Sequence, residues 1–390
     1  MNRHRDLLLT VLSRLIAFPT VSDQSNLDLV SYVRELCEPH AALIHQVDDP
    51  DEPKASLLVR FGPDAPGGIL LSGHTDVVPA DPEGWQSDPF RLEQRGDRLY
   101  GRGTADMKGF IAAVLAAILE SPSSAAPGAQ LQRPVYLALT YDEEVGCLAA
   151  PPLIESFRDR IAPLSAVLVG EPSGMQPVVA NKGISEYITE FHGRSAHSSK
   201  PQLGINAIEL AHHYAARILQ LAADFRTTGQ QNSCDPPYTT IQLGTIAGGS
   251  ATNVVPDYCR LSCDLRSFHD SDRQFFETEM AAVRQQLLQQ YNLDPAAITT
   301  SITCNVPPLE PRPDSTAIRL AQELTGETRL NRVPYATEAG QYQQAGYEAV
   351  ILGPGSIEQA HQRDEWISLA QLDSCQAMLQ RLLALQSRPD

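Results

Sequence analysis

An imidazole and a carboxylate stand two residues apart in the run ILLSGHTDVV, which spans residues 69–78. Alternate residues of an extended segment share one face, so the side chains of His74 and Asp76 can point into one pocket. A carboxylate beside a ligating imidazole fixes its tautomer and raises its basicity. His-x-Asp is a short motif, and a strand that ends in a polar turn explains it equally well when it is taken alone.

A predicted strand that ends in polar or glycine-rich residues occurs four times along the chain. Apolar runs at 69–72, 135–140, 166–169 and 349–352 each precede ionisable or glycine-rich residues. In open α/β sheets ligands bind at the carboxyl ends of the strands, so we expect one crevice there. The side chains expected to converge on it are those of His74, Asp76, Asp106, Glu143, Glu144, Glu171 and His361. Each acid alone would be read as a solvated loop carboxylate, so the hypothesis depends on their joint appearance at strand ends.

Two histidines and three carboxylates exceed the needs of one four-coordinate zinc ion. They fit two ions that share a bridging carboxylate. Glu143 and Glu144 are neighbours after a predicted strand, where both cannot comfortably ligate the same ion. One of the two is therefore free to act as a general base.

Composition excludes several classes of protein. The formal charge of −17 argues against a nucleic-acid-binding surface. Seven scattered cysteines, with no Cys-x-x-Cys pair, suit a reducing cytoplasm. Arg14 interrupts the first apolar stretch, which favours an amphipathic helix over a signal peptide. The run from Phe110 to Leu119 is too short to cross a bilayer. We expect a cytoplasmic protein with no nucleic-acid or membrane partner.

At 390 residues the chain exceeds the usual size of a single core, so two domains are expected. Between 183 and 305 the pattern is β-α-β-β-α-β, which is typical of a small ferredoxin-like α+β domain. We assign this domain to residues 182–306, inserted into an α/β domain formed by 1–181 and 307–390. An edge of its sheet would be available for pairing with a second copy of itself.

Five segments resemble the co-catalytic di-zinc amidohydrolases, the family of aminoacylases, desuccinylases and glutamate carboxypeptidases. They are SGHTDVVP (72–79), GRGTADMKG (101–109), DEEVG (142–146), GEPS (170–173) and GRSAHS (193–198). The resemblance covers nearly the whole chain in the right order. Within the family the acetylornithine deacetylase branch is the most similar, through YATEA (335–339) and LGPGSIEQAHQRDEW (352–366). Asn181 departs from the pattern, where a histidine is expected.

The resemblance implies a phosphorylase/hydrolase-like α/β/α catalytic domain with a ferredoxin-like dimerisation (lid) domain. It implies two Zn²⁺ ions per chain, with Co²⁺ as a possible substitute. By motif, His74 and Glu171 are terminal ligands of one ion, Glu144 and His361 are those of the other, and Asp106 is the bridge. Asp76 matches the residue that orients His74, and Glu143 matches the base that deprotonates the bridging water.

Further roles follow from the same resemblance. His197, in the lid, matches a residue that reaches the site of the partner subunit in a homodimer. Arg266 is expected to grip the substrate α-carboxylate, with Asn253 nearby, and Glu338 to pair with a free side-chain amine.

The implied reaction removes the acetyl group of N2-acetyl-L-ornithine, giving L-ornithine and acetate, a step of arginine biosynthesis. One alternative is a succinyl-diaminopimelate desuccinylase or a broad N-acyl-amino-acid amidohydrolase. A desuccinylase needs a cation for the distal carboxylate, and no surplus one stands at a matched position. A more remote alternative is a non-catalytic metal-dependent binding protein, which would have no need of Glu143.

Overall fold

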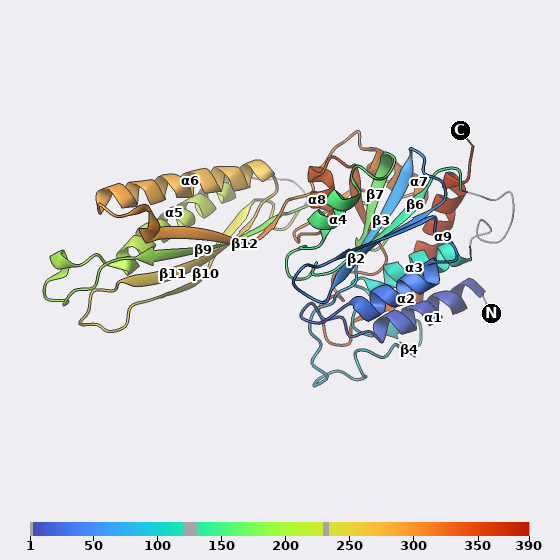
Figure 1. The fold of residues 1–390 in the computed structure, drawn as a ribbon, viewed down its shortest axis with the longest axis horizontal. Coiled ribbons are helices and arrows are strands. Elements are labelled where there is room, and N and C mark those ends of the chain that lie inside the picture. The colour runs from blue at the N-terminus through green and yellow to red at the C-terminus, as the bar shows by residue number, and fades with distance from the viewer. Residues whose placement is uncertain (1–2, 121–130, 229–233, 390) are drawn as a thin grey trace. The chain divides into compact units, whose positions relative to one another are not determined.

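The computed structural model describes residues 3–120, 131–228 and 234–389, and the chain divides into two compact units (Figure 1). The larger unit comprises residues 1–179, 311–331 and 337–390. The smaller unit comprises residues 180–310 and 332–336.

An eight-stranded sheet underlies the larger unit, in the order β1-β2-β6-β3-β7-β14-β8-β13. These strands are β1 (Leu43–Asp48), β2 (Ala55–Phe61), β3 (Gly68–His74), β6 (Val135–Thr140), β7 (Leu164–Pro172), β8 (Val178–Asn181), β13 (Asn331–Val333) and β14 (Ala349–Gly353). The neighbours β6, β3, β7 and β14 run parallel to one another. They are the four predicted apolar runs, and their near-continuous hydrophobicity is typical of parallel strands that are buried on both faces.

Helices cover both faces of this sheet. One hydrophobic core joins it to α1 (Arg3–Ile16), α2 (Leu27–Cys37), α3 (Lys108–Leu119), α7 (Thr316–Thr325) and α9 (Leu369–Gln386). The short helices α4 (Ala150–Phe157) and α8 (Ala339–Gln344) pack on the other face (Figure 1). Helix α3 lies between the sheet and the helices α1 and α9, which explains why it is apolar nearly all round.

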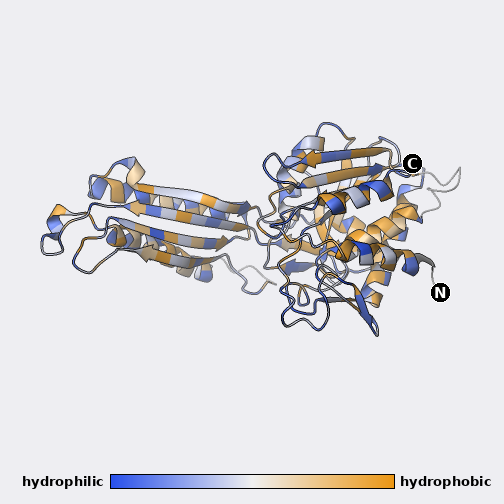
Figure 2. Ribbon diagram, turned by 60° about the horizontal axis from the view of Figure 1, so that its bottom comes forward, coloured by the Kyte–Doolittle hydropathy of each residue, from blue (hydrophilic) through white to orange (hydrophobic). Residues whose placement is uncertain are grey.

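The smaller unit is a four-stranded antiparallel sheet in the order β10-β11-β9-β12. Its elements are β9 (Ile184–His192), α5 (Ala207–Thr228), β10 (Thr240–Gly248), β11 (Tyr258–Arg266), α6 (Asp270–Gln290) and β12 (Ile298–Val306). Both helices lie on one face of the sheet (Figure 1). The two central strands, β9 and β11, alternate along their length (Figure 2), so one of their side chains in two enters the core.

The fold class predicted from the sequence is therefore confirmed: an α/β/α unit with a large mixed sheet, and a separate ferredoxin-like α+β unit. The three-stranded sheet β15-β5-β4 was not predicted. Its strands β4 (Glu93–Arg95), β5 (Arg98–Tyr100) and β15 (Trp366–Ser368) are too short to show a period of two residues. Across the described residues, no helix combines the length and the apolar character needed to cross a membrane.

Candidate active site

The candidate side chains gather at the carboxyl edge of the parallel strands. His74 is the last residue of β3, Glu171 lies at the end of β7, and Glu143 and Glu144 follow β6. Asp106 precedes α3, and its carboxylate contacts His74. The carboxyl ends of adjacent parallel strands meet at one edge, and this topology brings together residues that are far apart in the sequence.

Asp106 joins the two histidines. Its Oδ1 lies 3.0 Å from Nε2 of His74, and its Oδ2 lies 3.3 Å from Nε2 of His361. Each imidazole faces a second carboxylate: Oε1 of Glu171 is 3.6 Å from His74, and Oε2 of Glu144 is 2.9 Å from His361. The cluster therefore has two halves, each with one histidine and one glutamate, and Asp106 belongs to both.

This donor set fits divalent metal ions. Single ligand atoms of His74, Asp106 and Glu144 lie within 4.8 Å of one another, as do those of His74, Glu143 and Glu171. Among the described residues, Oε1 of Glu171 is a buried oxygen with no hydrogen-bond partner. Imidazole nitrogens and carboxylate oxygens are ligands that Zn²⁺ and similar ions accept.

The cluster concentrates negative charge in a buried place. Burial raises the pKa of Glu171 well above its usual range, and the neighbouring carboxylates of Asp106 and Glu143 add to that rise. Burial also acts to raise the pKa of Asp106, but hydrogen bonds to His361 and His74 hold it below its usual value. Hydrogen bonds to Asp106 and Glu144 raise the pKa of His361 to about 10. A bound cation would offset the repulsion among these carboxylates.

Asp76 holds His74 and the Glu143–Glu144 loop at once. Nδ1 of His74 lies 2.9 Å from the Asp76 carbonyl oxygen and 3.4 Å from its Oδ1, which leaves Nε2 facing the cluster. The backbone N–H groups of Glu143 and Glu144 donate to the Asp76 carboxylate, each over 3.2 Å. The Ser22 hydroxyl donates to its Oδ2 over 2.8 Å. Asp76 thus fixes the orientation of one histidine and the place of two acids.

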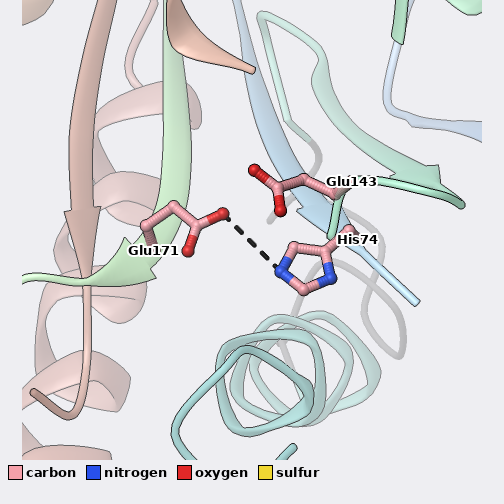
Figure 3. A group of neighbouring side chains, drawn as sticks. All are labelled: His74, Glu143 and Glu171. Atoms are coloured by element: carbon pink, nitrogen blue, oxygen red, sulfur yellow. Dashed lines mark ion pairs between the residues drawn. The ribbon is translucent and has the colours of Figure 1, made fainter. Parts of the chain in front are cut away.

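Glu143 lies beside the first half of the cluster. Its carboxylate and that of Glu171 point toward each other, next to the imidazole of His74 (Figure 3). The Cys147 thiol donates to Oε1 of Glu143 over 3.3 Å. Burial raises the pKa of Glu143 well above its usual range. A carboxylate with a raised pKa is a better proton acceptor near neutral pH, as a general base requires.

Glu338 lies in the same unit and is almost completely buried, with 1% of its surface exposed. Its Oε2 accepts a hydrogen bond from the Ser72 hydroxyl over 3.2 Å. In the described part of the chain its Oε1 has no hydrogen-bond partner. Its charge contributes to the raised pKa of Glu143, so the two carboxylates are close enough to interact.

The other three candidates belong to the smaller unit. His197 is exposed, and its Nδ1 contacts the Ser199 hydroxyl at 2.8 Å. Its loop runs beside that of Asn253, because the Ser198 N–H donates to the Asn253 carbonyl over 3.0 Å and His197 pairs with Val254.

Arg266 ends β11, whereas Asn253 precedes the start of that strand at Tyr258. Eight residue steps of about 3.3 Å separate the two ends of β11, a distance of about 26 Å. Within one chain, Asn253 and Arg266 therefore lie toward opposite ends of β11, and their joint role in holding the substrate stays a prediction. Arg266 pairs instead with Asp264, with its Nε 3.1 Å from Oδ2.

Two residues that support the cluster, Lys54 and Glu365, were not predicted from the sequence. Nζ of Lys54 donates to both carboxylate oxygens of Asp142, each over 2.9 Å, and so anchors the start of the loop that carries Glu143. The carboxylate of Glu365 binds the loop that carries Asp106. Lys54 lies outside the quoted segments, and Glu365 lies within LGPGSIEQAHQRDEW (352–366), where the resemblance gives it no role. Their buried contacts show what each of them supports.

Comparison with known proteins identifies the family. Residues 70–385 match the peptidase family M20/M25/M40. The chain belongs to this family. The acetylornithine deacetylase of Pasteurella multocida is 33% identical over 386 residues, covering 96% of this chain and 97% of that protein. The acetylornithine deacetylase of Myxococcus xanthus is 33% identical over 382 residues, covering 97% of each.

Crystal structures of other proteins share the fold of this chain. Aminopeptidase PepT from Bacillus cereus superposes with a TM-score of 0.76 at 17% identity, covering 98% of this chain and 99% of that one. An M20 family metallo-carboxypeptidase from Sulfolobus solfataricus superposes with a TM-score of 0.73 at 18% identity, covering 99% of this chain and 100% of that one. Membership of the M20/M25/M40 family makes the chain a hydrolase and implies that it binds divalent metal.

Proposed function

We propose that the chain is a di-metal amidohydrolase that cleaves N2-acetyl-L-ornithine to L-ornithine and acetate. The observation that carries the proposal is the Asp106 carboxylate, which offers one oxygen to each of two histidines, each with its own glutamate. The choice of substrate rests on relatives named acetylornithine deacetylase, which are 33–37% identical over most of the chain.

Two ions would be held by the two halves of the cluster. His74 and Glu171 would bind one ion, Glu144 and His361 the other, and Asp106 both. Zn²⁺ suits these ligands, and Co²⁺ could replace it. When bound, the ions would lower the pKa of a water molecule and polarise the amide carbonyl. A Bacillus subtilis relative in the same family is described as a dinuclear metal-binding peptidase.

Metal-saturated protein is expected to contain two divalent ions per chain, because the cluster offers one ligand more than a tetrahedral ion needs. Elemental analysis after removal of free metal measures this ratio. Glu144→Gln removes a ligand of one half only, so this variant should lose occupancy at one site and keep the other. A wild-type ratio that stays at one ion per chain under saturating metal would contradict the two-ion scheme.

Glu143 is the proposed general base. Its carboxylate would accept a proton from the attacking water and return it to the leaving amine. Its raised pKa and its place beside His74 and Glu171 support this role. A binding protein without catalysis would need ligands for the ions but no such base, so Glu143 favours an enzyme.

Glu338 is the proposed partner of the ornithine side-chain amine. Its buried Oε1 has no hydrogen-bond partner among the described residues. A cationic group placed beside a buried, unpaired carboxylate oxygen stabilises it by a charge-assisted hydrogen bond. An acidic group at this place favours a cationic substrate over the distal carboxylate of a succinyl group.

Arg266→Ala is expected to raise KM for N2-acetylornithine by about 10- to 100-fold, because a charge-assisted hydrogen bond contributes about 1.5–3 kcal/mol. Metal content should stay at the wild-type level. Arg260→Ala is the matched control, since Arg260 is exposed on the same face of β11. Steady-state kinetics of both variants give the comparison, and an unchanged KM in Arg266→Ala would assign the α-carboxylate to another residue.

We also propose a homodimer through the smaller unit. Strand β10 is an edge strand, and large apolar side chains are exposed on it and on the adjacent α5: Ile246 is 59% exposed and Leu219 58%. Such an edge is usually paired or covered. The separation of about 26 Å along β11 adds a second argument. His197 and Arg266 can serve one small substrate only if they come from different subunits.

A substrate panel tests the proposed function. Metal-loaded protein should release acetate from N2-acetyl-L-ornithine with a higher kcat/KM than it shows for N-succinyl-diaminopimelate or a neutral N-acetyl amino acid. Faster cleavage of the succinyl substrate would indicate the desuccinylase alternative. Equal rates on all N-acetyl amino acids would indicate a broad amidohydrolase.

A further inference from the structure

Glu365 makes four hydrogen bonds to a single loop of the larger unit. Its side chain is buried, with 1% exposed, and it stands four residues after His361. Oε1 accepts from the N–H groups of Ala105 (2.8 Å) and Asp106 (3.1 Å). Oε2 accepts from the N–H of Gly103 (2.9 Å) and from Nη1 of Arg102 (2.8 Å). Each oxygen thus has two donors, and all four donors belong to residues 102–106.

This loop has no helix or strand of its own to hold it. It lies between β5 and α3, and within the described residues it contains turns only. Backbone contacts tie the same two segments together, since the Gly101 N–H donates to the Glu365 carbonyl over 3.0 Å and β15 pairs with β5. The side chain of Glu365 continues this attachment up to Asp106 itself.

Asp106 requires such support because its carboxylate serves both halves of the cluster. One oxygen faces His74 and the other faces His361, so a small rotation of the loop would misalign both. Glu365 and His361 lie in one segment, and Asp106 lies in the other. The hydrogen bonds that Glu365 accepts from the loop therefore set the position of Asp106, the shared ligand, relative to His361, a ligand of one half.

We propose that Glu365 is a positioning residue that holds the Asp106 loop in the geometry required for binding of both ions. This inference rests on the proposed function for the assignment of Asp106 as the shared ligand. A glutamine cannot replace Glu365, because its amide group would place N–H donors against the N–H donors of the loop. Residues that orient metal ligands in this way typically affect metal affinity by 10- to 100-fold when they are mutated.

The test measures metal affinity directly, without substrate. Glu365→Gln should bind Zn²⁺ about 10- to 100-fold more weakly at both sites, as determined by competition with a chromophoric chelator. The absorption spectrum of the Co²⁺-loaded variant should differ from that of the wild type, because ligand geometry changes. Glu358→Gln, an exposed position in the same segment, is the matched control and should behave as the wild type.

Glu365→Asp keeps the charge but shortens the side chain, and it provides a second variant if Glu365→Gln does not fold. It should also weaken both sites. Circular dichroism of the metal-free proteins separates a folding defect from a loss of affinity. A folded variant with wild-type affinity and a wild-type Co²⁺ spectrum would overturn the proposal. If the wild type itself binds fewer than two ions, the two-ion scheme is wrong. The affinity of the variants for the remaining ion then shows whether Glu365 positions the ligands of that site.

Discussion

Glu143→Gln is expected to lower kcat by at least ~100-fold and to leave metal content at the wild-type value. Glutamine keeps the size of the side chain but cannot accept the proton of the attacking water. Asp76 binds the backbone N–H of Glu143, and this contact does not depend on the side chain. The loop should therefore keep its place in the variant, and the loss should appear in the chemical step.

The metal content of this variant also decides between two roles for Glu143. Its ligand atom lies within 4.8 Å of those of His74 and Glu171, so geometry alone allows it to be a ligand. A ligand role predicts that Glu143→Gln loses an ion together with its activity. Glu144→Gln is the reference for such a loss, because Glu144 contacts His361 in the other half. Normal turnover in Glu143→Gln would require another base.

A mixture of two inactive proteins is expected to recover activity. His197→Ala should lower kcat by about 10²–10³-fold if His197 stabilises the oxyanion of the reaction. In a dimer that shares this residue, one Glu143→Gln subunit and one His197→Ala subunit form a single complete site. That site has Glu143 from one chain and His197 from the other. Activity should therefore appear after subunit exchange and increase with the fraction of mixed dimer.

The control mixes Glu143→Gln with Glu143→Ala, which cannot form a complete site in any pairing. Subunit exchange is measured separately, by native mass spectrometry of differently tagged chains. If mixed dimers form and no activity appears, His197 acts within its own chain or has no part in the reaction. If each protein remains a monomer, the proposed pairing through β10 is wrong.

Much of the fold could be predicted because local patterns matched the final environment. The buried parallel strands β3, β6, β7 and β14 are continuous apolar runs, and β11 alternates because one of its faces meets α5 and α6. The short strands β4, β5 and β15 could not be predicted in the same way. Three residues carry too little pattern, and their pairing depends on contacts between distant segments.

His74, Glu144 and Glu171 could be located because each follows a recognisable strand end, whereas Asp106 lies in a polar loop before the apolar helix α3. The resemblance implied Asp106 as the bridge, and the structure adds which of its oxygens faces which histidine. Lys54 and Glu365 act through hydrogen bonds to loops, and such contacts leave no periodic signal. Asn253 precedes β11 and Arg266 ends it, so the length of this strand separates the two residues, which the sequence alone did not indicate.

Metal-dependent release of acetate tests the central claim most directly. Protein freed of metal by chelation, and shown by circular dichroism to remain folded, is titrated with Zn²⁺ or Co²⁺ while acetate release from N2-acetyl-L-ornithine and bound metal are measured in the same samples. We predict no release above background without metal, and activity that rises as ions bind, up to two per chain. Full activity in folded protein with no bound ion, or no acetate release at two ions per chain, would contradict the account.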